Sequence, residues 1–297
     1  MAIDQPSGFT GDPARHRFEA AYDRAFQRLW PVPADPLDVP TRWGTVRVHR
    51  AGRAGDDPLV LLGGAGGNAL GWYRHVAALA RTHPVLAIDP LGEAGRSVAT
   101  RPVATGDDAG GWLADVLAAV GAQRAHLVGT SFGGWTALQQ QLTDGGRVAA
   151  LTLVDPAGFA PLTGRFYRWL VLGGLAGLLP AAVRGQAARW LDNPTITETE
   201  LLRLGLAGRG FRRRLPVPPV LTDEELRAVA VPVQLLLGAR SVLHDSAAVA
   251  ERVAAVAPGW RVEVVPDTGH ALVLDRVDLV VDRVLAFPAA VDGAPGS

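Results

Sequence analysis

Hydrophobic and polar positions follow two alternating patterns along most of the chain. Short apolar runs are typical of strands buried on both faces, and the segments between them repeat apolar residues every three or four positions, as amphipathic helices do. The predicted strands are 45–50, 59–63, 85–89, 125–129, 150–155, 233–238 and 261–265, and the predicted helices are 13–29, 71–81, 108–120, 133–143, 246–256 and 276–286. This alternation predicts an α/β fold, with a mostly parallel sheet flanked by helices.

Two segments interrupt the alternation. Residues 31–40, "PVPADPLDVP", are rich in proline and predict a connector. Residues 157–220 contain helical patterns and no strand pattern, which predicts a helical cap over the carboxyl ends of the strands, where open α/β sheets bind ligands. The expected domains are an N-terminal helix and connector (1–40), an α/β core (41–156 and 221–290), a cap (157–220) and a tail (291–297), with residues 1–12 as a further loose end.

Composition narrows the class of protein. The 297 residues are 48% hydrophobic and 20% charged, and 29 basic residues, all arginine, balance 29 acidic ones. This balance gives no reason to expect a nucleic-acid or membrane partner. The absence of cysteine excludes disulfides and thiolate catalysis. No signal-peptide pattern, metal-ligand grouping or phosphate-binding loop is found, so we expect a cytoplasmic protein without metal or cofactor.

The stretch "LVGTSFGGW" (127–135) places Ser131 between Gly129 and Gly133, after an apolar run and before a helical pattern. A sharp strand-to-helix turn leaves no room for side chains beside its central residue, and glycine removes the Cβ atoms that would clash. The serine hydroxyl then stands exposed at the start of a helix. This is the Gly-x-Ser-x-Gly turn of a nucleophilic serine.

A serine nucleophile needs a base, and His270 is the best placed of the seven histidines. It follows the predicted strand 261–265 on a polar loop, in "VVPDTGHALVLDRVDLV" (264–280). That position puts an imidazole at the carboxyl end of a strand, within reach of a serine on a neighbouring strand.

These motifs together resemble the α/β-hydrolase superfamily over residues 41–290. Two further segments resemble it: "LVLLGGAGGNALGWYRHVAALA" (59–80) is similar to the oxyanion loop of the family, and "VLAIDPLGEAGRS" (85–97) to its Asp-x-x-Gly turn. The resemblance implies that the backbone N–H groups of Ala65 and Phe132 form an oxyanion hole. Gly63 stands where the family usually has histidine.

The acid that orients the histidine is not where most of the family has it. The usual position is occupied here by Ser241. Asp155, at the end of the predicted strand 150–155, is our preferred acid, because some branches of the family, the haloalkane dehalogenases among them, carry it on that strand. Asp245 is the alternative, although its place before a helix also suits an N-cap. A Ser–His pair without any carboxylate stays open.

Four aromatic or basic features are candidates for substrate contact. Trp72, Phe166 and Trp169 could line an apolar pocket, and the arginine-rich "GRGFRRRLP" (208–216) could hold an acidic carrier protein, although a solvated face is the simpler interpretation. We predict a serine hydrolase that cleaves an ester or thioester with an apolar acyl or alcohol part through an acyl-enzyme. The alternatives are a non-hydrolytic lyase or cyclase that uses His270 as a general base, and a non-catalytic ligand-binding protein.

Overall fold

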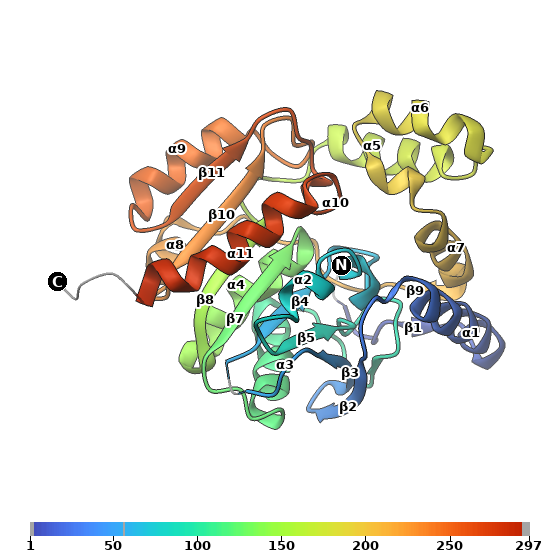
Figure 1. Cartoon of the computed structure of the whole chain (residues 1–297), viewed down its shortest axis with the longest axis horizontal. Helices are drawn as coiled ribbons and strands as arrows, with labels where there is room; N and C mark the ends of the chain where they lie inside the picture. Colours follow the sequence, from blue (N-terminus) through green and yellow to red (C-terminus); the bar gives the residue numbers. More distant parts are fainter. Residues whose placement is uncertain (1–2, 56, 293–297) are drawn as a thin grey trace.

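A nine-stranded sheet forms the centre of the computed structural model, which describes residues 3–55 and 57–292 (Figure 1). Six strands run parallel, while β3 and β2 are antiparallel at one edge, where β6 (Val98–Ala99) also pairs with β3. The order across the sheet is β11 (Arg261–Val265), β10 (Val233–Gly238), β8 (Val148–Val154), β7 (Ala125–Thr130), β4 (Leu59–Leu62), β5 (Val85–Ile88), β3 (Gly44–Ala51) and β2 (Asp35–Thr41). The predicted fold class is therefore confirmed.

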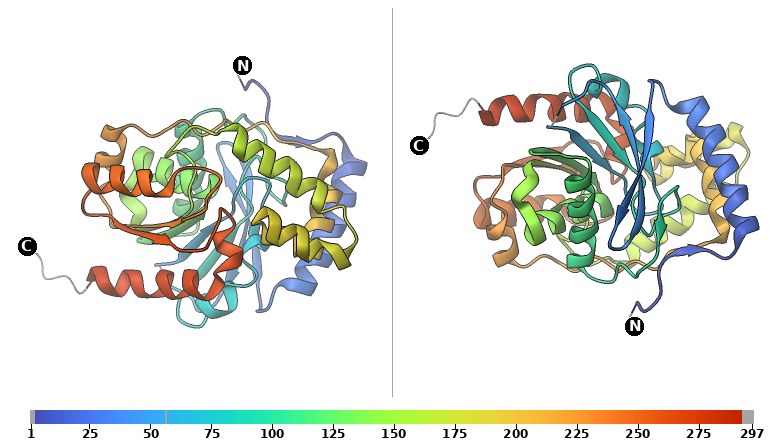
Figure 2. Two further views of the ribbon diagram at one scale, coloured as in Figure 1. Left: turned by 90° about the horizontal axis from the view of Figure 1, so that it is seen from above. Right: turned by 90° about the horizontal axis from the view of Figure 1, so that it is seen from below.

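Helices cover both faces of the sheet because alternate side chains of the buried strands point to opposite sides. On β4, Val60 and Leu62 belong to one core cluster, and Leu59 and Leu61 to the other. The first cluster packs under α3 (Gly106–Ala119), α4 (Phe132–Asp144), α8 (Asp223–Ala228) and α9 (Ser246–Val256). The second packs under the single turn α2 (Val76–Leu79), α10 (Leu272–Asp275) and α11 (Val277–Asp292). The helix α1 (Asp12–Leu29), blue in Figure 2, contributes to this cluster from one side of the molecule.

The chain between β8 and β10 forms a separate helical layer. Figure 1 shows its helices, yellow to light brown, set beside the sheet rather than stacked on either face. The elements are α5 (Gly164–Ala176), α6 (Ala181–Leu191), the 3₁₀ turn η3 (Pro194–Thr197), α7 (Thr199–Ala207) and the 3₁₀ turn η4 (Gly208–Gly210). An extended strap, residues 211–222, then returns to α8.

The structure corrects two predicted elements. Residues 35–41 are a strand, not a connector: Pro36 and Pro40 lie on the outermost strand, where a missing N–H costs no ladder hydrogen bond. The helix predicted over 71–81 is split into the 3₁₀ turn η1 (Ala69–Trp72) and the four-residue α2. The spacing of its apolar residues resembles that of an amphipathic helix, because both short turns bury these residues in the second core cluster.

Both expected loose ends are partly held in place. Near the N-terminus, β1 (Gly8–Phe9) pairs with β9 (Phe211–Arg212), and the Ser7 hydroxyl accepts a hydrogen bond from the Arg214 N–H. At the other end, α11 continues to Asp292 instead of ending near 286. The rest of the predicted tail, residues 293–297, lies outside the described residues.

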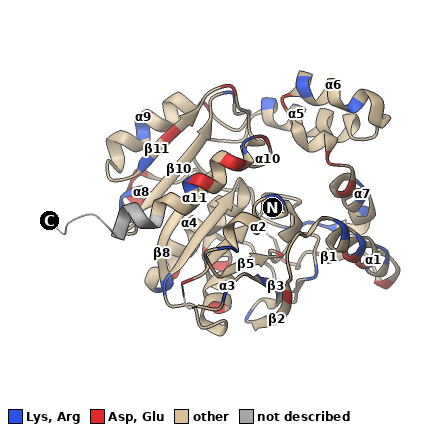
Figure 3. Ribbon diagram, viewed as in Figure 1, with Lys and Arg blue, Asp and Glu red and all other residues tan. Residues whose placement is uncertain are grey.

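Charged side chains of both signs are spread over the outer elements (Figure 3). Among the described residues, no helix combines the length and the apolar character needed to cross a membrane.

Candidate active site

Ser131 lies at the point where β7 ends and α4 begins. Its backbone has φ 51° and ψ −118°, a left-handed conformation that is costly for a residue with a side chain. The turn is held on both sides, since the Ser131 N–H donates to the Val154 carbonyl on β8 and the Ser131 carbonyl accepts from Ala157 N–H. The half-exposed hydroxyl stands at the N-terminal, positive end of a 13-residue helix.

The glycines around Ser131 allow backbone segments to touch. A Cβ on Gly129 would lie 2.4 Å from the Gly133 carbonyl oxygen, and one on Gly133 would lie 2.4 Å from the Leu62 carbonyl oxygen. Gly64 plays the same part on the facing loop, where a Cβ would come within 3.2 Å of the Ser131 Cβ. The loop after β4 therefore lies directly against the serine.

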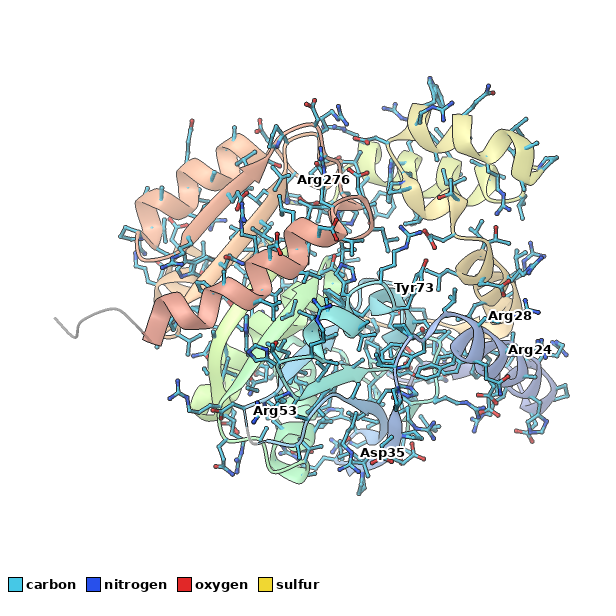
Figure 4. All side chains as sticks on the ribbon, in the orientation of Figure 1. Arg24, Arg28, Asp35, Arg53, Tyr73 and Arg276 are labelled. Carbon is cyan, nitrogen blue, oxygen red and sulfur yellow. The ribbon has the colours of Figure 1, made fainter. Side chains whose placement is uncertain are left out.

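His270 follows β11 on a loop that is fastened from two directions. Arg240 N–H donates to the Thr268 carbonyl, and Arg276, labelled in Figure 4, donates through Nε to the Thr268 hydroxyl over 3.0 Å. The His270 ring is largely buried, and its Nδ1 lies 2.6 Å from Asp155 Oδ2. The structure shows no hydrogen bond between the described side chains of Ser131 and His270; in unliganded sites such a bond is often long.

Asp155 is a fully buried carboxylate at the end of β8. Its Oδ1 accepts the Gly238 N–H over 2.9 Å, and its Oδ2 accepts the Ser241 hydroxyl over 2.6 Å as well as contacting His270. Both oxygens of this buried carboxyl group therefore have hydrogen-bond partners. Ser241, which stands at the usual acid position, thus donates a hydrogen bond to Asp155 instead.

Asp245, the alternative acid, has a different position. Its side chain accepts the N–H groups of Ala247 and Ala248 and caps the N-terminus of α9. The residue is exposed, and no contact with His270 is seen for it within the described chain. The structure therefore gives it the capping geometry.

Sequence reasoning overlooked a second histidine beside Asp155. His244 is buried, and its Nε2 lies 3.6 Å from Asp155 Oδ1. Burial lowers the pKa of the His244 imidazole, and the Asp155 charge opposes that decrease. His244 is therefore a neutral neighbour of the carboxylate, and its only signal in the sequence is its proximity to Ser241.

The two N–H groups expected to form an oxyanion hole flank the serine. Phe132 is the first residue of α4, and Ala65 follows Gly64 on the loop that touches Ser131. Within the described part of the chain, neither of these N–H groups donates a hydrogen bond to a protein acceptor. Both are free to bind an oxygen that develops negative charge near Ser131.

Two of the three aromatic candidates lie beside His270. Phe166 and Trp169 of α5 meet the imidazole edge-on, with ring centroids 5.9 and 5.6 Å away. Trp72 does not, because it is 1% exposed in the second core cluster and packs edge-on against His75. The burial of Trp72 does not fit the expected substrate contact.

Other contacts fasten the helical layer to the core. Arg240 binds Asp192 at the end of α6 with Nε over 3.1 Å, and Arg28 of α1, labelled in Figure 4, binds Glu200 of α7 over 3.0 Å. The arginine-rich stretch 208–216 is also used internally, since Arg213 pairs with Glu93 and Arg214 donates to the Pro6 carbonyl. Arg213 and Arg214 are therefore engaged within the protein, whereas Arg209 and Arg212 of the same stretch are exposed.

No grouping of three or more histidine or acidic side chains suited to a metal ion occurs among the described residues. The arrangement combines a strained serine at a helix start, a histidine bonded to a buried carboxylate, and two backbone N–H groups without a protein acceptor among the described residues.

Comparison with known proteins assigns the class. Residues 59–283 match the alpha/beta hydrolase family, so the chain belongs to that family, and the predicted resemblance is confirmed. Two Bacillus subtilis proteins are similar along nearly the whole chain. Carboxylesterase nap is 29% identical over 287 residues, 93% of this chain and 94% of the relative, and carboxylesterase YbfK is 28% identical over 281 residues, 91% and 93% of the two chains. The crystal structure of the naproxen esterase from Bacillus subtilis superposes with a TM-score of 0.81 at 27% identity, covering 93% of this chain and 99% of that one.

Proposed function

We propose that the protein is a serine carboxylesterase in which Ser131 is the nucleophile, His270 the general base and Asp155 the acid. The observation that carries the proposal is the continuous arrangement from Gly238 and Ser241 through Asp155 to His270 Nδ1, beside a strained serine. The similarity to carboxylesterases over more than nine-tenths of the chain supports the same reaction class.

In this mechanism His270 Nε2 takes the proton of the Ser131 hydroxyl as its oxygen attacks the ester carbonyl. Asp155 holds the imidazole in the tautomer that leaves Nε2 free and stabilises the imidazolium. The carbonyl oxygen becomes an oxyanion and is bound by the N–H groups of Ala65 and Phe132. His270 returns the proton to the leaving alcohol, and a water activated by the same imidazole then cleaves the acyl-enzyme.

We further propose that the substrates are small-molecule esters or thioesters with an apolar acyl or alcohol part. Phe166 and Trp169 flank the base with aromatic surface, and both come from the inserted helical layer 157–220, which would act as the cap. The non-hydrolytic alternative rested on the missing standard acid and on an apolar cap, and the contact between Asp155 and His270 speaks against the first of these grounds.

Turnover of p-nitrophenyl esters of increasing acyl length, by wild-type protein and by Ser131→Ala, tests the proposal. We expect hydrolysis by the wild type and a loss of several orders of magnitude in kcat for the folded variant. Near-full activity in Ser131→Ala would contradict nucleophilic catalysis by this serine.

A further inference from the structure

An ion pair between the buried Glu93 and the more exposed Arg213 lies between the two segments that carry the proposed oxyanion donors. Glu93 sits on the turn after β5 and is only 2% exposed. Its Oε2 accepts the Gly66 N–H over 3.0 Å, and its Oε1 accepts the Arg213 Nε–H over 2.8 Å. Burial raises the pKa of the Glu93 carboxyl, while the charge and hydrogen bond of Arg213 oppose the rise. Burying a carboxylate this deeply is costly unless hydrogen bonds and an opposite charge compensate for the lost water. Here the Gly66 N–H and Arg213 supply them.

The Gly66 hydrogen bond acts on the first donor. The Gly67 N–H bonds to the Gly64 carbonyl, which closes a four-residue turn with Ala65 and Gly66 at its centre. Gly66 has φ 75°, the positive value required at the third position of a type II turn. By holding the Gly66 N–H, Glu93 fixes the plane of the Ala65–Gly66 peptide and, through it, the orientation of the turn that presents the Ala65 N–H.

Arg213 acts on the second donor. Its guanidinium carbon lies 4.9 Å from the centre of the Phe132 ring, a distance that gives a favourable cation–π contact. Phe132 supplies the other N–H, so the Glu93–Arg213 pair touches both sides of the proposed hole. Arg213 comes from the strap that follows the cap, far from both loops in the sequence.

The turn that carries Glu93 is itself held rigidly against the oxyanion loop. Asp89 accepts the Ala69 N–H over 2.9 Å, and the Asn68 amide donates to the Ala94 carbonyl over 3.0 Å. The strap is held too, since Leu215 packs against Gly92, where any Cβ would lie 2.4 Å from the leucine. Glu93 is therefore a fixed anchor and not a mobile surface charge.

We propose that Glu93 and Arg213 are positioning residues that set the geometry of the two oxyanion donors. This inference rests on the proposed esterase function. Misplacing a donor weakens binding of the transition state without changing contacts to the substrate's acyl or alcohol groups. Loss of the pair should therefore lower kcat and leave KM nearly unchanged.

The test compares Glu93→Gln and Arg213→Lys with wild type, using p-nitrophenyl butyrate and phenylboronic acid, whose serine adduct places an oxygen in the hole. Glutamine keeps the size and one acceptor but loses the charge, and lysine keeps the charge but loses the flat guanidinium. We expect kcat to fall about tenfold to a hundredfold in Glu93→Gln, less in Arg213→Lys, with weaker boronate inhibition in the same order. Arg214→Lys is the matched control, because Arg214 contacts Pro6 and not the site, and its kcat should not change.

Thermal unfolding of each variant separates positioning from stability. Folded variants with wild-type kcat and boronate affinity would overturn the positioning role while leaving the esterase intact. If Glu93→Gln does not fold, the double variant Glu93→Gln/Arg213→Gln, which removes both charges, would be tested in its place. If the double variant does not fold either, the role of the pair is structural and the inference is overturned. A wild-type protein that hydrolyses no ester would instead contradict the proposed function.

Discussion

The Nδ1 of His270 lies 2.6 Å from the Oδ2 of Asp155, which directly follows β8, the strand next to the one that leads to Ser131. Because β8 and β10 are neighbours in the sheet, a carboxylate at the end of either strand can reach the same imidazole. In this chain Ser241 stands where most of the family has the acid after β10, and its hydroxyl donates a hydrogen bond to Asp155 after β8.

This relationship predicts different effects for two aspartates. Asp155→Asn should lower kcat by about 10⁴, because the amide cannot stabilise the imidazolium or hold the reactive tautomer. Asp245→Asn should change neither rate nor stability, since asparagine caps a helix about as well as aspartate. Steady-state kinetics and urea unfolding of both variants check the pair. A larger loss in Asp245→Asn would move the acid to that residue, and two silent variants would favour a Ser–His pair.

The aromatic residues of α5 predict a specificity effect. Phe166→Ala should raise KM for esters with bulky apolar acyl groups more than for acetate esters, because it removes aromatic surface beside His270. Val171→Ala is the control, because this side chain lies on the same helix and is exposed. Kinetics on an acyl-length series measures the effect. An unchanged ranking of substrates in Phe166→Ala would remove this residue from recognition.

The close contacts at the nucleophile turn predict opposite effects for two helical glycines. Gly133→Ala should destabilise the protein by about 3 kcal/mol or more, because the new methyl group would meet the Leu62 and Gly63 carbonyl oxygens at 2.4 and 2.5 Å. Gly174→Ala in α5 has open space around it and should stabilise by about 0.5–1 kcal/mol. Urea unfolding at neutral pH distinguishes them. Equal effects would show that the backbone around Gly133 can relax.

Two buried histidines outside the site predict acid sensitivity. Burial lowers the pKa of His75 to about 4 and that of His126 to about 3. The unfolded chain titrates near 6.5 and binds more protons below that value, so stability is lost as the pH falls from about 6.5 toward 4. Each histidine should contribute a slope of about 1.4 kcal/mol per pH unit in the free energy of unfolding. Urea unfolding between pH 7 and 5 should show a smaller slope for His126→Asn; an unchanged slope would contradict this assignment.

Most of the sheet was predictable because its strands are buried on both faces and appear as continuous apolar runs. The predicted bounds of β10 and β11 are those of the structure. The edge strand β2 was not recognised, because Pro36 and Pro40 exclude a central strand but not an outer one. Local patterns describe the environment of each segment only on average, and the edge of a sheet depends on the rest of the fold.

The site was predictable where its chemistry is local. The Gly-x-Ser-x-Gly turn needs its glycines within a few residues, so the sharp strand-to-helix turn at Ser131 can be predicted from sequence alone. The hydrogen bonds from Gly238 and Ser241 to Asp155 could not be predicted in this way. Both residues lie more than eighty positions away and come close to Asp155 only through strand pairing. Glu93 and Arg213 likewise meet across 120 positions, with nothing in either local sequence to indicate the other.

Covalent labelling is the most direct test of whether Ser131 is the nucleophile. The wild-type protein and Ser131→Ala would be treated with a fluorophosphonate, and the modified residue identified by mass spectrometry of peptides. We expect one adduct, on Ser131, with labelling slowed by Asp155→Asn and absent from Ser131→Ala. A folded wild-type protein that is not labelled, or is labelled at another residue, would contradict Ser131 as the nucleophile.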